Sequence, residues 1–83
     1  MADNERVAKL VEDMVAAVVD DEDRVTVNMV GSKGTCVIEV DVAPDDRGKV
    51  IGKGGSTANA MRTIIRAVSG KTHIRYFLEI NEG

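Results

Sequence analysis

The chain has 83 residues, of which 43% are hydrophobic and 30% are charged, a balance that fits one small globular domain and excludes a disordered tail. A single cysteine, Cys36, and a single histidine, His73, exclude an internal disulfide and a thiolate metal cluster, so we expect no metal and no cofactor. The net charge of −3 argues at first sight against a nucleic-acid partner, but the charges are unevenly distributed. Residues 1–46 carry twelve acidic and four basic side chains, whereas residues 47–83 carry seven basic and two acidic ones.

Such a charge split can place a basic surface on an acidic protein, unless the two halves interleave in space and their fields cancel. The N-terminus lacks a basic region followed by an apolar run, and no stretch approaches the roughly 18 apolar residues of a membrane span. We therefore expect a soluble, cytoplasmic protein without a membrane partner. Residues 1–83 are expected to form one domain, with its core over about residues 5–81.

The first predicted element is a helix with an apolar stripe at helical spacing, made of Val7, Leu10, Val11, Met14 and Val18. Asp3 or Asn4 is expected to cap its start. The acidic run at residues 20–23 ends the helix as a solvated turn, because it lacks the glycine and the distal glutamate of a calcium loop.

Two strands follow, because apolar and polar residues alternate over two short stretches. The apolar positions are Val25, Val27 and Met29 in the first and Cys36, Ile38, Val40 and Val42 in the second. The turn-forming segment at residues 31–34, Gly-Ser-Lys-Gly, predicts that they pair as an antiparallel hairpin. Cys36 is expected to be a core residue rather than a nucleophile.

Pro44 closes the second strand, and Asp45 and Asp46 are expected to cap a short helix at about residues 47–51. A glycine-rich loop comes next, followed by a helix that begins at residue 56 or 57 and ends at Ser69-Gly70. Its buried stripe is expected to be Met61, Ile64, Ile65 and Val68. A last strand alternates cleanly, with Ile74, Tyr76, Leu78 and Ile80 on one face and Phe77 on the other. The order α-β-β-α-α-β predicts an α+β fold, a three-stranded mixed sheet covered on one face by three helices.

The loop Gly52-Lys53-Gly54-Gly55 carries the functional signal. Its glycines let the backbone approach a ligand closely, the following helix directs free N–H groups toward it, and Lys53 adds positive charge, which together suit phosphate. A Walker A motif is excluded because only three residues separate Gly48 from Gly52 and glycine occupies the hydroxyl position at 54. The dinucleotide fingerprint is excluded because Thr57 stands where its third glycine belongs.

The segment Val50-Ile51-Gly52-Lys53-Gly54-Gly55 resembles the Gly-x-x-Gly loop of KH domains with its preceding apolar pair, and the element order is similar to the bacterial, type II KH fold. The resemblance covers nearly the whole chain and implies a small KH-only protein that clamps the backbone of about four nucleotides of single-stranded RNA. It implies contacts from Gly52, Lys53, Gly54 and Gly55, an apolar groove at Ile51 with Val40 or Val42, and outer phosphate contacts from Lys49, Arg47 and Arg62. Arg66 and Arg75 are expected on solvated faces.

The implied role is that of a post-transcriptional regulator or RNA chaperone with no small-molecule substrate. Because one such site binds weakly, a homodimer or a heterodimer with a larger KH-containing RNA-binding protein is expected to add avidity. The pairing surface is either the open sheet face, where Phe77 would lie beside Val37 and Val30, or the apolar rim near Ile51. A KH-fold scaffold with little RNA binding is the alternative. An enzyme is not expected, because Asp45 and Asp46 are the only carboxylates near the loop and capping accounts for them.

Overall fold

The computed structural model describes residues 2–82 and confirms the predicted order of elements. The α-helices are α1 (Ala2–Val18), α2 (Arg47–Ile51) and α3 (Ser56–Thr72), and the strands are β1 (Thr26–Ser32), β2 (Thr35–Asp41) and β3 (Arg75–Ile80). Short 3-10 turns occupy Glu22–Arg24, Pro44–Asp46 and Lys53–Gly55. Within the described residues, no helix is long and apolar enough to cross a membrane.

The sheet has β2 at its centre, paired antiparallel with β1 and parallel with β3, so the predicted mixed sheet is confirmed. The chain returns from β2 to β3 through α2 and α3, which supply the length that a parallel connection needs. The hairpin turn between β1 and β2 is shorter than predicted, because Ser32 pairs with Thr35 and only Lys33 and Gly34 remain between them. Both have positive φ, 46° and 82°, as a two-residue hairpin turn of this twist requires.

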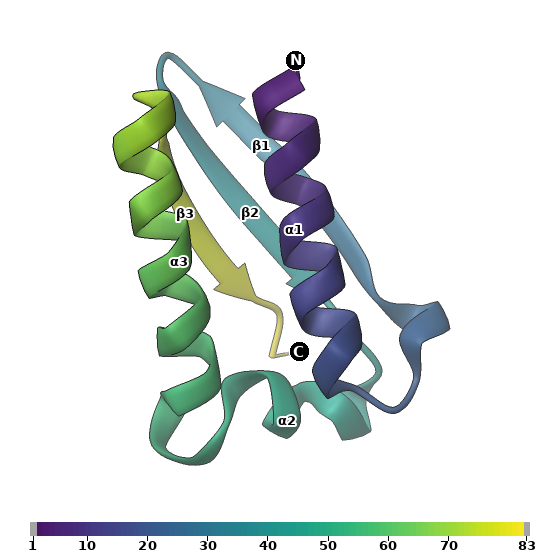
Figure 1. Cartoon of the computed structure of the whole chain (residues 1–83). Coiled ribbons are helices and arrows are strands. Elements are labelled where there is room, and N and C mark those ends of the chain that lie inside the picture. Colours follow the sequence, from purple (N-terminus) through teal and green to yellow (C-terminus); the bar gives the residue numbers. More distant parts are fainter. Residues whose placement is uncertain (1, 83) are drawn as a thin grey trace.

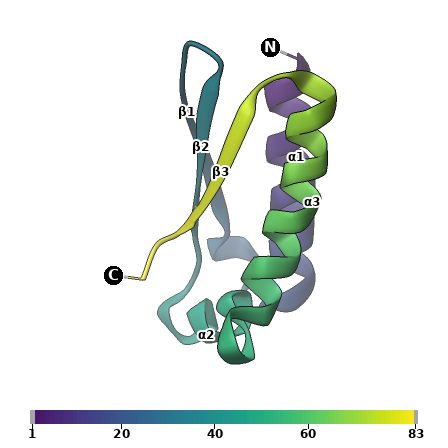
Figure 2. The same cartoon turned by 90° about the vertical axis from the view of Figure 1, so that its left-hand side faces the viewer.

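Helices α1 and α3 lie side by side over one face of the sheet and run in opposite directions (Figure 1). The short α2 lies at the end of the sheet where β2 and β3 finish, and it contributes the buried Val50 to the same core. Seen edge-on, the strands and the two long helices form two layers, and the far face of the sheet is open (Figure 2).

The core lies between these layers and includes Cys36, as predicted. On α1 the buried residues recur at every fourth position, Val7, Val11 and Val15, and Val19, just after the helix, continues this series. The predicted stripe is therefore partly wrong: Leu10 is 36% exposed and Val18 is 38% exposed, because they lie on the margin of the face that the sheet covers. On α3 the buried residues are Ala58, Met61 and Ile65, and the predicted core residue Ile64 is 45% exposed for the same reason.

The ends of the two long helices also differ from the prediction. Asn4 lies inside α1 rather than capping it, and its side-chain oxygen accepts a hydrogen bond of 2.5 Å from the Tyr76 hydroxyl on β3. Helix α3 continues two residues beyond Gly70, and the left-handed residue that ends it is His73, with φ 62°. The His73 N–H donates to the Ser69 carbonyl at 3.0 Å, which closes this last turn.

Candidate nucleic-acid interface

The joint between α2 and α3 is built from glycine backbone. Gly52 ends α2 by donating its N–H to the Gly48 carbonyl at 2.8 Å, and the Gly55 N–H donates to the Gly52 carbonyl at 3.0 Å. Gly52, Gly54 and Gly55 all have positive φ, at 80°, 63° and 81°. The chain therefore makes a tight turn between two helices with little side-chain bulk on its surface.

Gly52 and Gly54 differ in how strictly they must be glycine. A Cβ on Gly52 would lie 2.4 Å from Thr57 Oγ1 and 2.6 Å from the Thr57 backbone nitrogen, whereas a Cβ on Gly54 would meet nothing within 4 Å. The backbone at Gly52, with ψ 167°, is also in a region that is essentially restricted to glycine. Gly52 thus holds α2 against the start of α3, and Gly54 leaves open space beside the loop.

The loop presents positive charge to this open space. Helix α3 has 17 residues and no side-chain cap, but the N–H groups of Gly55 and Ser56 already donate to the Gly52 and Lys53 carbonyls. Lys53 is exposed, and within residues 2–82 no carboxylate lies within 4.0 Å of its ammonium group. The positive end of the helix dipole and the Lys53 ammonium together favour an anion such as phosphate.

Of the residues predicted to line an apolar groove beside the loop, only Ile51 has a side chain with accessible surface. Ile51, the last residue of α2, is half-buried and keeps accessible surface. Val40 and Val42 are 1% and 3% exposed, because their side chains point into the core beneath the helices, so the prediction that one of them lines a groove is wrong.

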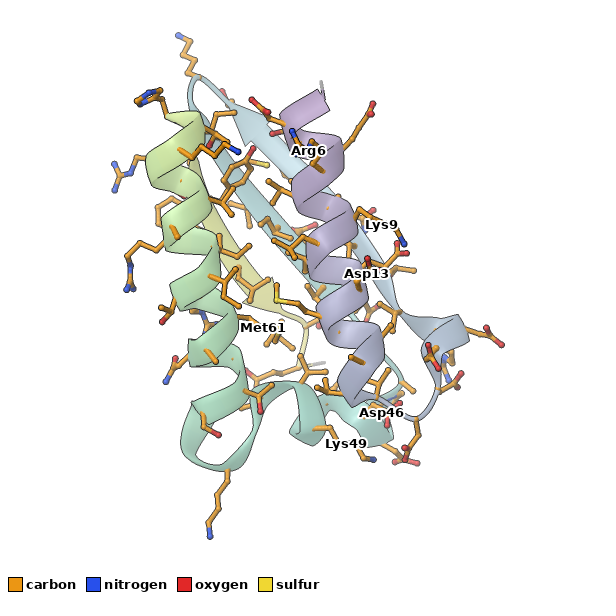
Figure 3. The ribbon with its side chains drawn as sticks, in the orientation of Figure 1. Arg6, Lys9, Asp13, Asp46, Lys49 and Met61 are labelled. Atoms are coloured by element: carbon orange, nitrogen blue, oxygen red, sulfur yellow. The ribbon has the colours of Figure 1, made fainter. Side chains whose placement is uncertain are left out.

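Helix α2 has no side-chain cap, so the prediction that Asp45 and Asp46 cap it is wrong, and Asp46 binds the chain that follows α1 instead. Its Oδ2 accepts the Asp21 N–H at 3.0 Å, and its Oδ1 accepts the Asp20 N–H at 3.3 Å. The Lys49 ammonium lies 3.3 Å from the same carboxylate and 3.0 Å from that of Asp20, and Figure 3 shows Lys49 next to Asp46 below α1. Asp46 is 2% exposed, so this network joins α2 to the chain that follows α1.

This network shifts the pKa values of Asp46 and Lys49, in each case toward the charged form. The N–H of Asp21, aided by that of Asp20 and by Lys49, holds the pKa of the Asp46 carboxyl below its ordinary value. Hydrogen bonds to Asp20 and then Asp46 raise the pKa of Lys49. Lys49 is thus an ion-paired residue in the free protein, and a phosphate at this predicted site must compete with two carboxylates.

Arg47 and Arg62, the two arginines predicted to contact phosphates, occupy different environments. Arg47 is half-buried, and its Nε is enclosed without a hydrogen-bond partner among the described residues. Arg62 extends from α3 toward the sheet, where Nη2 donates to the Leu78 carbonyl at 3.3 Å and Nη1 donates to Asn59 Oδ1 at 3.4 Å. Arg62 therefore bridges α3 to the outer edge of β3.

This bridge lies in a groove of about 310 Å³ that the sequence did not predict. Its lining includes Arg62, Arg66, Ser69, Arg75, Tyr76 and Phe77. Arg66 and Arg75 are exposed, as expected, and both line this groove. The four-residue spacing of Arg62 and Arg66 places both on one side of α3, and this was the available sequence signal. No group of three histidine, cysteine or acidic side chains in residues 2–82 is arranged to hold a metal ion.

Known proteins are similar to this chain in sequence over most of their own length. An RNA-binding protein KhpA of Mycobacterium tuberculosis is 45% identical over 65 residues, which cover 78% of this chain and 81% of the relative. Proteins of the same name from Caldanaerobacter subterraneus and Aquifex aeolicus are 43% and 44% identical over 72 and 73 residues, covering 87% and 88% of this chain and 96% and 92% of theirs. No solved structure gave a significant match.

The family model described as "KhpA/KhpB, KH domain" matches residues 8–80, a range that includes the glycine loop and every strand of the sheet. The predicted type II KH resemblance and the α+β fold are therefore confirmed. The chain belongs to the KhpA/KhpB family of KH domains.

Proposed function

We propose that this chain is a cytoplasmic protein that binds single-stranded RNA and clamps the backbone of about four nucleotides against the loop Gly52-Lys53-Gly54-Gly55. The KhpA relatives are named as RNA-binding proteins, and the match to them spans the loop. The implied cellular role is that of a post-transcriptional regulator or RNA chaperone. Unstacked bases would lie toward Ile51, whereas Lys53 and Arg62 would contact phosphates.

The observation that carries the proposal is the start of α3, which has no side-chain cap, beneath a glycine loop whose Lys53 has no carboxylate within 4.0 Å among residues 2–82. The positive charge of Lys53 and the positive end of the α3 dipole meet at this loop, which favours an anionic ligand over the scaffold alternative. A phosphate-ester enzyme would need a free carboxylate at the loop. Both oxygens of Asp46 already accept backbone N–H groups, and among residues 2–82 no group of three histidine, cysteine or acidic side chains places a metal ion beside the exposed Asp45, which supports a binding role without catalysis.

The test is the double variant Lys53→Asp/Gly54→Asp. It places two negative charges where phosphates are proposed to lie, and the open space beside Gly54 accepts the new side chain. The left-handed backbone at Gly54 costs about 1–2 kcal/mol for a non-glycine residue, so the protein should remain folded. Binding is measured by fluorescence anisotropy with mixed-sequence single-stranded RNA, and folding by circular dichroism.

The hairpin turn offers a matched control at the opposite end of the molecule (Figure 1). Lys33→Asp/Gly34→Asp makes the same change in charge, and Gly34 likewise has positive φ and open space for a side chain. The proposal expects RNA binding to be lost in the loop variant and retained in the hairpin variant. A folded loop variant that binds like the parent would refute it, and equal losses in both variants would indicate an effect of net charge alone.

We also propose that the chain pairs with itself or with a larger KH-containing RNA-binding protein, since a second site would raise a weak affinity through effective concentration. One candidate surface is the open sheet face, where Val30, Val37 and Phe77 lie in one row across the three strands. Val30 and Phe77 are 57% and 47% exposed. Another is the helix layer, where Ile64 on α3 is exposed; the rim at Ile51 is the third.

Analytical ultracentrifugation at tens of micromolar tests this pairing and separates the surfaces. Phe77→Glu should dissociate a dimer formed through the sheet face, Ile64→Glu one formed through the helix layer, and Ile51→Glu one formed at the rim. A parent that remains monomeric, both alone and when mixed with a larger KH-containing protein, would contradict the pairing proposal.

A further inference from the structure

The open face of the sheet, on the side away from the helices, presents its side chains in rows that run across the three strands (Figure 2). Each row follows from the register, because the strands are paired residue by residue. An apolar row lies between two polar rows. From the hairpin end, the three rows are Ser32, Thr35 and Arg75, then Val30, Val37 and Phe77, and then Asn28, Glu39 and Glu79.

The two polar rows carry charges of opposite sign. Arg75 is exposed at the hairpin end, whereas Glu39 and Glu79 are exposed on the other side of the apolar row. Within residues 2–82, none of these three side chains has an oppositely charged group within 4.0 Å. Arg75 and Glu79 cannot meet inside one chain, because four residues of extended strand hold them about 13 Å apart. Both charges are therefore available to a partner.

The apolar row gives this partner a surface to cover. Val30 and Phe77 are 57% and 47% exposed at its two ends, with the half-buried Val37 between them. The guanidinium carbon of Arg75 lies 5.6 Å from the centroid of the Phe77 ring, so the charge borders the apolar surface directly. A monomer tolerates an apolar row of this size, and the arrangement of charges must therefore identify what binds there.

A second copy of the chain fits the charges when its strands run in the opposite direction. Two identical faces pack against each other about a two-fold axis, so that each contact occurs twice. With this axis along the apolar row, each Phe77 meets its own counterpart and each Arg75 lies opposite the second copy's Glu79. With the axis along the strands, each Glu39 would instead lie opposite the second copy's Glu39 and repel it. The charge pattern thus favours the reversed arrangement.

We infer that the open sheet face binds a second copy of this chain with the strands of the two copies antiparallel, joined by two Arg75–Glu79 pairs that flank a shared apolar row. The inference rests on the pairing proposed above and selects its partner, its surface and its orientation. Three strands about 20 Å long offer roughly 300 Å² for each copy, against about 800 Å² in a standard interface. We therefore expect a weak dimer in rapid exchange, with its orientation set by charge.

The orientation has a consequence for RNA binding. The glycine loop lies at one end of the molecule and the hairpin turn at the other (Figure 1). In the reversed dimer, the loop of each copy lies toward the hairpin turn of the other, so the two loops are at opposite ends. A single RNA strand that is held by both loops must then run the length of the dimer.

The experiment reverses one charge at a time and then recombines the variants. Arg75→Glu replaces both ion pairs of the dimer with pairs of carboxylates, and Glu79→Arg replaces them with pairs of guanidinium groups. An equimolar mixture of the two variants restores two opposite pairs, as does the double variant Arg75→Glu/Glu79→Arg by itself. Sedimentation equilibrium is measured at low salt from about 10 µM to about 1 mM, the range of a weak interface. RNA is left out, because Arg75 also lines the groove beside α3.

We expect each single variant to weaken the dimer about tenfold or more, and the mixture and the double variant to return to within about threefold of the parent. Salt at about 1 M should remove most of the difference between the single variants and the parent, because it screens exposed charges. The matched controls Arg6→Glu and Glu12→Arg make the same changes in charge on α1, in the other layer of the molecule, and should associate like the parent; Figure 3 shows Arg6 on this helix.

Single variants that associate like the parent would overturn the inference and leave the proposed pairing to another surface. A mixture that associates no better than either variant alone would overturn the reversed orientation. A parent that is monomeric over the whole concentration range would also overturn the inference. The broader pairing proposal fails with it only if the parent also forms no complex with a larger KH-containing protein.

Discussion

Replacing Gly52 with alanine tests whether the glycine loop is a rigid joint. The added methyl group would lie 2.4 Å from Thr57 Oγ1, 2.6 Å from the Thr57 nitrogen and 2.8 Å from Thr57 Cβ. Rotating the threonine side chain cannot relieve the contact with the nitrogen, because this atom belongs to the backbone of α3. The variant must therefore move α3 relative to α2 or change the conformation of the loop.

The cost has two parts. A non-glycine residue at φ 80° and ψ 167° is strained by about 1–3 kcal/mol, and overpacking adds about 1–3 kcal/mol. A domain of 83 residues has a free energy of unfolding of about 4–12 kcal/mol at the usual stability per residue. Gly52→Ala should therefore remove a large part of the stability, and it should weaken RNA binding because the loop no longer holds its shape.

Gly54→Ala is the control, because its Cβ would have open space and only the left-handed strain of about 1–2 kcal/mol remains. Both alanines restrict the unfolded chain in the same way, so this contribution cancels in the comparison. Urea unfolding followed by circular dichroism should show Gly52→Ala less stable than Gly54→Ala by about 1–4 kcal/mol. Thermal midpoints should separate by roughly 4–8 °C for each kcal/mol.

The reasoning fails if the two alanine variants unfold at the same urea concentration. That result would mean that the loop relaxes around the new methyl group at no cost, and that α2 and α3 are not held in register by Gly52.

Further predictions concern the core, the buried carboxylate and the electrostatics of binding. Ile38→Ala in the centre of β2, where the side chain is fully buried, should cost about 2–5 kcal/mol with an unchanged urea m-value; a loss below about 1 kcal/mol would contradict the assigned core. Because the folded-state pKa of Asp46 is lowered, its contribution is present above the unfolded-state value of about 3.9 and lost as pH falls through the folded-state pKa. The stability advantage of the parent over Asp46→Asn should therefore be full at pH 7 and shrink below about pH 4; urea midpoints that differ equally at pH 7 and pH 3 would exclude this role. A single-stranded RNA that makes three or four phosphate contacts at the loop should bind with a salt slope of about −2 to −3, and single strands should be preferred over duplex; a slope near −6 would indicate a broad basic surface instead.

The sequence by itself determined the features that depend on near neighbours in the chain. Side chains alternate along a strand, so the pattern of β3 was enough to place Tyr76 and Leu78 in the core and Phe77 on the open face. The glycines at 52, 54 and 55 predicted a break between two helices, and all three have the positive φ that such a break uses. The apolar periodicities then implied the order of elements, and that order left few ways to bury each apolar face once.

Only the tertiary structure decided which margin of each helix is covered and which charges meet. Leu10, Val18 and Ile64 have the correct helical spacing for burial, but no neighbouring element reaches far enough to cover them. Asp46 resembles a cap in sequence, yet its hydrogen-bond partners are the N–H groups of Asp20 and Asp21, which lie 26 and 25 residues away. The uneven distribution of charge along the sequence likewise has its effect only in the folded structure. Lys49 forms ion pairs with acidic residues of the first half of the chain, whereas Arg62, Arg66 and Arg75 line one groove. Backbone preferences act over about four residues, but burial and ion pairing depend on atoms that folding brings together from distant parts of the chain.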